Sequence, residues 1–178
     1  GETVLEIGFG TGAGLVQMAE AVGENGRVHG IDISSGMLAA SRQRLAKAGL
    51  EQRVDLTCQD ALKMPYTDDK FEAVFMSFAL ELFDSPEIPQ VLAQGKRVLR
   101  PNGRLGVVSM SKENGPSPLM KIYEWLHQKL PQVIDCRPIY VEGSIREAGF
   151  AIQYQKHFSI FGIPGEIVVG TKPAGSSR

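Results

Sequence analysis

The sequence is poor in the residues on which disulfide-rich and metal-binding proteins depend. Its 178 residues include two cysteines, three histidines and one tryptophan. Cys58 and Cys136 form no C-x-x-C pair, so neither a disulfide-stapled secreted fold nor a zinc ribbon is expected. His29, His127 and His157 are scattered and join no cysteine pair, so we also expect no metal site.

An excess of charge of either sign is also missing. Nineteen basic and twenty acidic residues leave a net charge of −1, which argues against a nucleic-acid partner and against an anionic membrane surface. No apolar run is long enough to span a bilayer, and no signal peptide is apparent. We therefore expect a cytoplasmic protein with a small-molecule partner. The sequence leaves its oligomeric state open.

Apolar residues are plentiful: they make up 43 % of the sequence, which is enough to form a hydrophobic core. The length suits a single domain, which we place at residues 1–172 and follow with a flexible tail at 173–178. The organising stretch begins with a buried parallel strand at Thr3–Ile7, which breaks into glycines. A helix over Ala13–Val22 follows, and a second strand over Arg27–Ile31 delivers Asp32 at its carboxyl end.

The glycine turn fits two ligand classes. Gly8, Gly10 and Ala13 tolerate the G-x-G-x-x-G pattern of a nicotinamide-dependent oxidoreductase. The alternative is E-x-G-x-G-x-G, formed by Glu6, Gly8, Gly10 and Gly12. An acid at the turn is awkward for a phosphate and suits a ligand that carries an ammonium and a sulfonium. With Asp32 placed to accept the ribose hydroxyls, the pattern favours S-adenosylmethionine. The bland alternative makes Glu6 a solvated strand-end charge.

The rest of the chain alternates between helices and strands. Helices are predicted over Ser35–Ala48, Pro86–Leu99, Leu119–Leu130 and Val141–Ala148, and strands over Arg53–Thr57, Ala73–Phe78, Arg104–Met110, Phe150–Ile160 and Glu166–Lys172. A tight turn is predicted at Pro101-Asn102-Gly103, and a loop overhanging the site at Asn114–Pro118. This order predicts a doubly wound, Rossmann-like α/β fold of seven strands, in which a C-terminal hairpin adds one antiparallel strand.

Several segments resemble the class I S-adenosylmethionine-dependent methyltransferases, and above all the ubiquinone/menaquinone biosynthesis group. The run from Asp32 to Leu38 resembles D-x-S-x-x-M-L, and the run from Gln59 to Tyr66 resembles G-D-A-x-x-L-P-F. Phe71 to Val74 resembles F-D-x-V, and Val98 to Leu105 resembles V-L-K-P-G-G-x-L. These segments run in family order from Val4 to about Met110. The resemblance implies methyl transfer from S-adenosylmethionine, with S-adenosylhomocysteine as the product.

The cofactor-binding residues expected from the turn, the strand ends and the resemblance form three groups. Glu6 and the turn glycines should hold the methionine end, and Asp32 the ribose, with Ile33 beside it. The adenine should contact Met37, Asp60 and Ala61, and the sulfonium should lie near Ser77 and Phe78. Two of these residues have plainer alternatives: Met37 could be ordinary core, and Asp60 could simply cap a helix.

The segment after the fourth strand departs from the family. Many relatives carry histidine-type residues where Glu81 and Leu82 stand here. Glu81 is the remaining candidate for a catalytic general base, because burial can raise the pKa of a carboxylate. It is equally compatible with a solvated surface charge. A non-catalytic protein that only binds the cofactor therefore stays open as an alternative.

The expected acceptor is small and either apolar or aromatic. Aromatic and aliphatic side chains surround the expected pocket, and no basic cluster adjoins them: Phe78, Leu82, Phe83, Tyr123 and Trp125. The first strand begins two residues into the chain. Because family relatives carry N-terminal helices that cover cofactor and acceptor, we expect a lid segment to precede Gly1 in a longer protein.

Overall fold

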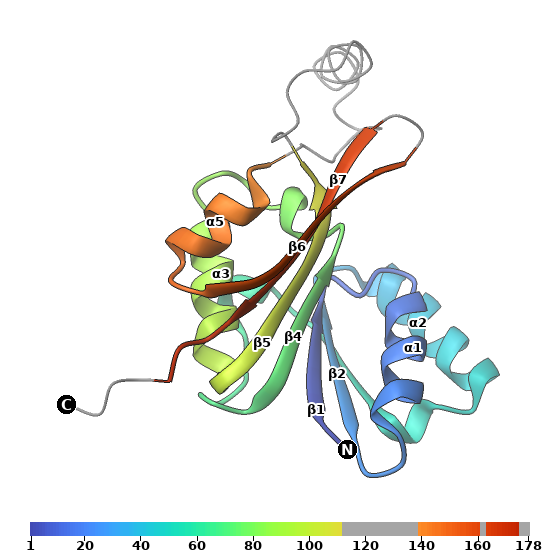
Figure 1. The fold of residues 1–178 in the computed structure, drawn as a ribbon. Helices are drawn as coiled ribbons and strands as arrows, with labels where there is room; N and C mark the ends of the chain where they lie inside the picture. Colours follow the sequence, from blue (N-terminus) through green and yellow to red (C-terminus); the bar gives the residue numbers. More distant parts are fainter. Residues whose placement is uncertain (112–138, 161–162, 175–178) are drawn as a thin grey trace.

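The fold is described from a computed structural model, which covers residues 1–111, 139–160 and 163–174. It is an α/β layered structure with helices on both faces of a twisted sheet (Figure 1). The strands are β1 (Thr3–Ile7), β2 (Arg27–Asp32), β3 (Val54–Cys58), β4 (Phe71–Ser77), β5 (Leu99–Met110), β6 (Ala151–Ile160) and β7 (Ile163–Thr171). The helices are α1 (Ala13–Val22), α2 (Ser35–Ala48), α3 (Ile88–Val98) and α5 (Val141–Glu147), with short 3₁₀ turns η1 (Glu51–Arg53), η2 (Ala61–Lys63) and η3 (Leu80–Leu82).

The seven strands form one sheet in the order β3-β2-β1-β4-β5-β7-β6. Neighbours from β3 to β5 run parallel, whereas β7 pairs antiparallel with both β5 and β6. The predicted doubly wound sheet with one inserted antiparallel strand is therefore confirmed. In a sheet of this topology, ligands bind outside the carboxyl ends of the parallel strands, where the chain order reverses. That position is the ends of β1 and β4.

Helices α1 and α2 cover one face of the sheet, and α3 and α5 cover the other (Figure 1). A hydrophobic core lies on each face. Side chains of β1 alternate between them, as a strand period of two requires. Val4 packs with α1 and α2, whereas Leu5 and Ile7 pack with α3 and α5. Glu6 shares the face of Val4, so its carboxylate enters the layer between the sheet and α1.

Local contacts explain where helices α2 and α3 begin and where α2 ends. The Ser34 hydroxyl accepts a hydrogen bond from the Met37 amide at 3.3 Å and caps α2, and Gly49 ends that helix in the left-handed region. The ends of α2 agree with the predicted range Ser35–Ala48. Helix α3 is shorter than predicted and starts at Ile88, after the Asp84 carbonyl has accepted the amides of Glu87 and Ile88.

The predicted tight turn at Pro101-Asn102-Gly103 is wrong. Strand β5 begins at Leu99, which pairs with Phe71, and the register shifts before the next pair. Asn102 occupies the left-handed region at φ 62° within this irregular stretch. The Asn102 amide donates to the carbonyl of Lys172, and the Lys172 amide donates to Gly103. These cross-strand bonds turn the expected turn into a bulged strand end.

A hollow of about 620 Å³ lies between α1 and the central strands. Its lining is largely apolar and includes Val4, Met18, Val22, Phe75 and Val169.

The expectation that a preceding lid segment covers the site stays a prediction. The predicted loop Asn114–Pro118, the helix Leu119–Leu130 and the end of the tail lie outside the described residues. Within the described ranges, no helix has the length and apolar character needed to cross a membrane.

Candidate cofactor site

The glycine turn follows β1 directly and packs too closely for larger residues. Gly8 has φ 73°, and a Cβ added there would lie 2.5 Å from the Cβ of Ala79. Gly10 also has positive φ, at 50°, but a Cβ added there would meet nothing within 4 Å. Gly8 is therefore required by packing and conformation. Gly10 faces open space, where a ligand can approach the backbone closely.

Asp32 is fixed at the end of β2 by hydrogen bonds to its carboxylate. One oxygen accepts the Gly10 amide at 3.0 Å, and the other accepts the Ser34 amide at 2.9 Å. Each carboxylate oxygen can accept more than one hydrogen bond, so both retain capacity. The turn and the acid thus form one unit, in which the glycine loop orients the carboxylate toward the carboxyl edge of the sheet.

A cavity of about 290 Å³ opens at this edge, between the turn and the segments that follow β3 and β4. Its size suits a nucleoside portion of a ligand, near the lower limit of the ~300–1,000 Å³ usual for small-molecule sites. The lining residues come from the carboxyl ends of β1 and β2 and from the segments that follow β3 and β4: Ile7, Gly8, Ile31, Asp32, Ile33, Gln59, Asp60, Ala61, Leu62, Ala79, Leu82, Phe83 and Glu87. Three of these residues are acidic, and none of them is lysine or arginine.

Asp60 has both of the features that the sequence suggested. Its Oδ1 accepts the Leu62 amide at 2.8 Å and caps η2, and the residue also lines the cavity. Ala61 is buried beside it and lines the same wall. The Gln59 amide donates to the carbonyl of Asp32 at 2.9 Å, which ties the end of β3 to the end of β2. The two acids are thereby held at adjacent positions along one edge.

Glu6 lies behind the glycine turn, outside the cavity lining. It is 2 % exposed, so the alternative of a solvated strand-end charge is wrong. Its Oε2 has no hydrogen-bond partner within the described part of the chain, and a Cβ added at Gly14 would lie 2.3 Å from its Oε1. Burial, followed by the nearby charge of Asp32, raises the pKa of Glu6 from 4.5 to about 8. The carboxyl is therefore neutral at pH 7 unless a cation approaches it.

Apolar side chains stand exposed around the cavity mouth. Ile33 is 76 % exposed and lines the cavity. Met37, on the first turn of α2, is 39 % exposed, so its core alternative is wrong, but it is not among the residues that line the cavity. Leu82 is 52 % exposed on the opposite wall. A rim of exposed aliphatic groups at a polar cavity is typical of a binding site for a flat, partly apolar ligand.

Ser77 and Phe78 lie at the end of β4, next to the cavity and outside its lining. Phe78 donates its amide to the carbonyl of Val108 at 2.7 Å and has φ 52°. A bulky residue rarely occupies the left-handed region, at a cost of about 1–3 kcal/mol, and such strain concentrates at functional sites. Its ring is partly exposed.

Glu81 is buried with partners, and its prediction as a surface charge is wrong. It is 1 % exposed; one oxygen accepts the Ser109 hydroxyl at 2.8 Å, and the other accepts the Met110 amide at 3.3 Å. Burial raises its pKa, and these hydrogen bonds oppose that rise. Glu81 does not line the cavity. The geometry shows it fastening η3 to β5, and its role as a general base stays a prediction.

Sequence reasoning did not name six residues of the cavity wall as site residues: Ile7, Ile31, Gln59, Leu62, Ala79 and Glu87. Leu82 and Phe83, which it placed around the acceptor pocket, line the same cavity. Ala79 and Glu87 could have been found from their position after β4, since that strand ends at the same sheet edge. Within the described ranges, no group of three or more histidine, cysteine or acidic side chains is placed to hold a metal ion.

Comparison with known proteins agrees with this geometry. The methyltransferase domain family matches residues 4–103, from β1 into β5. The demethylmenaquinone methyltransferase of Lactobacillus johnsonii is 33 % identical over 116 residues, which are 65 % of this chain and 47 % of that protein. The enzyme of the same name from Listeria monocytogenes is 35 % identical over 116 residues, 65 % of this chain and 48 % of that protein. The chain thus spans about half the length of the curated relatives it matches.

Two solved structures share the fold. A methyltransferase described as S-adenosylmethionine-dependent, from Methanosarcina mazei, matches with a TM-score of 0.78 at 18 % identity, covering 97 % of this chain and 92 % of that one. The [4+2]-cyclase SpnF matches with a TM-score of 0.79 at 22 % identity, covering 98 % of this chain and 76 % of that one. From its glycine turn, its acidic sheet edge and the family match over more than half its length, the chain belongs to the class I S-adenosylmethionine-dependent methyltransferase family and is related to the demethylmenaquinone methyltransferases.

Proposed function

We propose that the protein binds S-adenosylmethionine in the cavity at the carboxyl edge and transfers its methyl group to a small apolar or aromatic acceptor. One observation carries the proposal: Asp32, Asp60 and Glu87 line the cavity, and no lysine or arginine stands among its lining residues. A dinucleotide brings a pyrophosphate, which this acidic lining repels. A nucleoside that ends in a sulfonium and an ammonium is attracted to it.

The residues present fit such a cofactor at each of its parts. Asp32 keeps lone pairs for two ribose hydroxyls, and Asp60 and Ala61 form a wall for the base. The unpartnered Oε2 of Glu6 supports a role at the methionine end, since an ammonium nearby would compensate a buried carboxylate. The open space beside Gly10 admits the ligand to the backbone.

When bound, the cofactor supplies an electrophilic methyl group on a positively charged sulfur. The protein then has to align the acceptor with that methyl and keep water away, and such positioning is worth ~7–11 kcal/mol. Phe78, exposed directly after β4, is our candidate to contact the sulfonium, because an aromatic face stabilises a cation by about 0.5–2 kcal/mol. No described residue of the cavity wall is assigned as a general base, which favours an acceptor that is already nucleophilic, such as an electron-rich ring or a phenolate.

The acceptor class follows from the mouth of the cavity and from the relatives. Leu82 and Phe83 line it, and Ile33 and Phe78 are exposed around it. The matched relatives are named demethylmenaquinone methyltransferases, so the compound in their name has a quinone-type ring. Because the acceptor has to be electron-rich, we favour the reduced form of such a ring, a hydroquinone. Tyr123 and Trp125, which the sequence also placed at this pocket, lie outside the described residues.

Calorimetric titration tests the cofactor. S-adenosylhomocysteine is expected to bind at least about a hundredfold more tightly than NAD, because the pyrophosphate meets like charges at several kcal/mol. Comparable affinities for the two would refute the assignment. Incubation with methyl-labelled cofactor and a set of hydroquinones then separates enzyme from binding protein. Binding without S-adenosylhomocysteine formation from any acceptor would support the non-catalytic alternative.

A further inference from the structure

The segment that joins η2 to β4 needs an external support. Ala61 and Leu62 of η2 line the cavity, but residues 64–70 contain neither helix nor strand. A segment without a hydrogen-bonded ladder keeps its course only through other contacts. The position of the cavity wall therefore depends on what holds this stretch.

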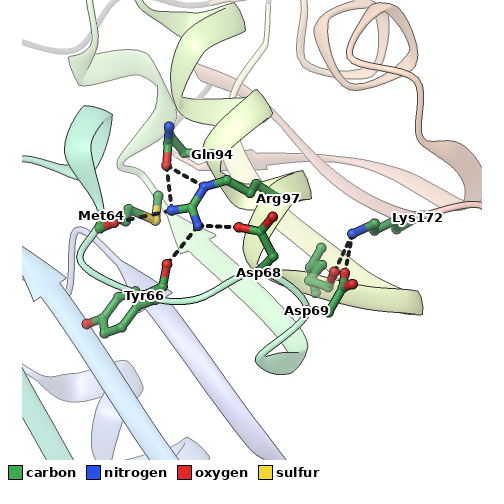
Figure 2. Close-up of polar contacts among 8 residues, drawn as sticks. Met64, Tyr66, Asp68, Asp69, Gln94, Arg97 and Lys172 are labelled. Carbon is green, nitrogen blue, oxygen red and sulfur yellow. Dashed lines mark hydrogen bonds and ion pairs between the residues drawn. The ribbon is translucent and has the colours of Figure 1, made fainter.

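One arginine on the neighbouring helix provides that support (Figure 2). The Nη2 of Arg97 donates to the carbonyl of Met64 at 3.2 Å, and its Nη1 donates to the carbonyl of Tyr66 at 2.7 Å. The same Nη1 forms an ion pair with Asp68 Oδ1 at 2.8 Å. The two carbonyl acceptors are two residues apart, so they lie on one edge of an extended stretch, and Asp68 stands in the turn that follows. The planar fork of the guanidinium reaches all three acceptors.

The guanidinium is itself held in place. The Gln94 side chain, one turn earlier on α3, accepts from Arg97 Nε at 3.1 Å and from Nη2 at 2.8 Å. The end of the segment is tied separately, because the Asp69 amide donates to the carbonyl of Arg97 and Asp69 Oδ1 pairs with Lys172 (Figure 2). Helix α3 is anchored in the core by buried aliphatic residues. The support therefore runs from a rigid helix to the segment.

The link to the cavity is short. Met64 directly follows η2, whose two hydrogen bonds both return to Asp60: the Leu62 amide to its side chain and the Lys63 amide to its carbonyl. We propose that Arg97 is a positioning residue for the adenine wall of the cavity, which fixes η2 and Asp60 by fastening the segment 64–68 to α3. The inference rests on the proposed function, since it supposes that the cavity holds the cofactor.

The test compares Arg97→Met with two controls that remove neighbouring ion pairs. Asp68→Asn deletes only the exposed pair, and Arg100→Met deletes the pair with Glu72, which touches no cavity residue. The probe is S-adenosylhomocysteine, titrated at a temperature at which circular dichroism shows each variant to be fully folded. Arg97→Met is expected to raise the Kd about tenfold or more, because small displacements of a binding group are costly. Each control is expected to change it less than about twofold.

A second readout separates local positioning from general loosening. Amide hydrogen exchange is followed at Leu62 and Lys63 on η2, and at Gly10 and Ser34, whose amides are held by Asp32. Arg97→Met should accelerate exchange only at the first pair. Arg97→Lys, which keeps the charge without the fork, should give intermediate values for both readouts.

The outcomes separate the two proposals. An unchanged Kd in Arg97→Met, or equal acceleration at both pairs of amides, would overturn the role of Arg97 while leaving the proposed function intact. If the parent protein itself fails to bind S-adenosylhomocysteine, the proposed function is wrong, and the inference built on it falls as well. A raised Kd in Arg97→Met, with accelerated amide exchange only at Leu62 and Lys63, supports both the proposed function and the role of Arg97.

Discussion

Replacing Glu6 by glutamine is expected to remove a large contribution to the pH dependence of folding stability between pH 4.5 and 8. Glu6 is buried in the layer between β1 and α1, and its Oε2 lacks a partner within the described residues. Burial is the larger cause of its pKa of about 8, and the charge of Asp32 is the smaller one. In the unfolded chain the same carboxyl titrates at its ordinary value of 4.5.

The sign and size of the effect follow from proton linkage. Between pH 4.5 and 8 the folded state keeps a proton that the unfolded state has released, so folding stability falls as pH rises. At about 1.4 kcal/mol per pH unit, this interval reduces the free energy of unfolding by up to about 5 kcal/mol, and the reduction reaches about 3 kcal/mol by pH 7. Glutamine has nearly the same shape and cannot ionise. It leaves an amide in a site with few partners, which costs about 1–3 kcal/mol at every pH.

The measurement is urea unfolding of parent and variant at half-unit steps from pH 4.5 to 8.5. The difference in unfolding free energy should shift steadily in favour of Glu6→Gln as pH rises. Glu2→Gln is the matched control, because Glu2 pairs with Arg104 and the pKa of Glu2 is lowered by that hydrogen bond. Glu2 stabilises the fold above its unfolded pKa of 4.5 and loses this contribution only below that pH, so the difference between parent and Glu2→Gln should stay level across the measured range.

Parallel stability curves for the parent and Glu6→Gln across this range would refute the reasoning. They would mean that the carboxyl titrates normally in the folded state, and hence that the site behind the glycine turn is hydrated. Addition of S-adenosylhomocysteine provides a further check. If its ammonium approaches Glu6, binding releases a proton below pH 8, and the affinity of the parent rises with pH while that of the variant stays level.

Further substitutions test other parts of the site and fold. Asp32→Asn should weaken S-adenosylhomocysteine binding by about 1–3 kcal/mol in calorimetry, because charge-assisted acceptors for the ribose are lost; equal affinities would remove Asp32 from the site. Gly8→Ala should destabilise the protein by at least about 1–3 kcal/mol in urea unfolding, because its Cβ would clash with Ala79 and its φ is positive. Burial and the charge of Lys70 lower the pKa of His29 from 6.5 to about 4. The stability contributed by neutral His29 should therefore be lost as pH falls through that interval, since the unfolded chain takes up the proton first, so the parent should lose stability relative to His29→Gln. Phe78→Gly should relieve the backbone strain at φ 52° and leave the melting temperature unchanged or higher, yet weaken cofactor binding.

The elements closest to the glycine turn could be predicted because local rules and packing agree there. Thr3–Ile7 and Ala13–Val22 were placed to the residue, and α2 was bounded by a serine cap and a left-handed glycine. Asp32 could be placed because parallel strands deliver the residues that follow them to one edge. The antiparallel β7 was recognised from two strand-like runs separated by a short glycine-containing segment.

The errors have a common cause in contacts that are distant along the chain. Pro101-Asn102-Gly103 has the composition of a turn, but hydrogen bonds to Lys172, some seventy residues away, hold it in a strand. Glu81 was compatible with a solvated charge because its apolar neighbours in the sequence offer it no partner, and only the sheet brings the Ser109 hydroxyl within hydrogen-bond distance. The cavity wall at Ala79 and Glu87 was missed because each residue alone carries no motif. The local sequence does not reveal contacts with residues that are distant along the chain.

The two buried glutamates show how burial and partners together distinguish their roles. Glu81 is as inaccessible as Glu6, but both of its oxygens accept hydrogen bonds from β5. A carboxylate with these partners stabilises the connection it makes, and Glu81 does not line the cavity. Glu6 keeps an oxygen without a partner in the described structure, next to a turn that faces open space at Gly10. A buried group left in that state persists only where something else compensates it, and a cationic ligand at the carboxyl edge would do so. The chemistry expected of this fold, in which the reacting methyl comes from a cation, therefore agrees with the position of the unpartnered carboxyl oxygen of Glu6.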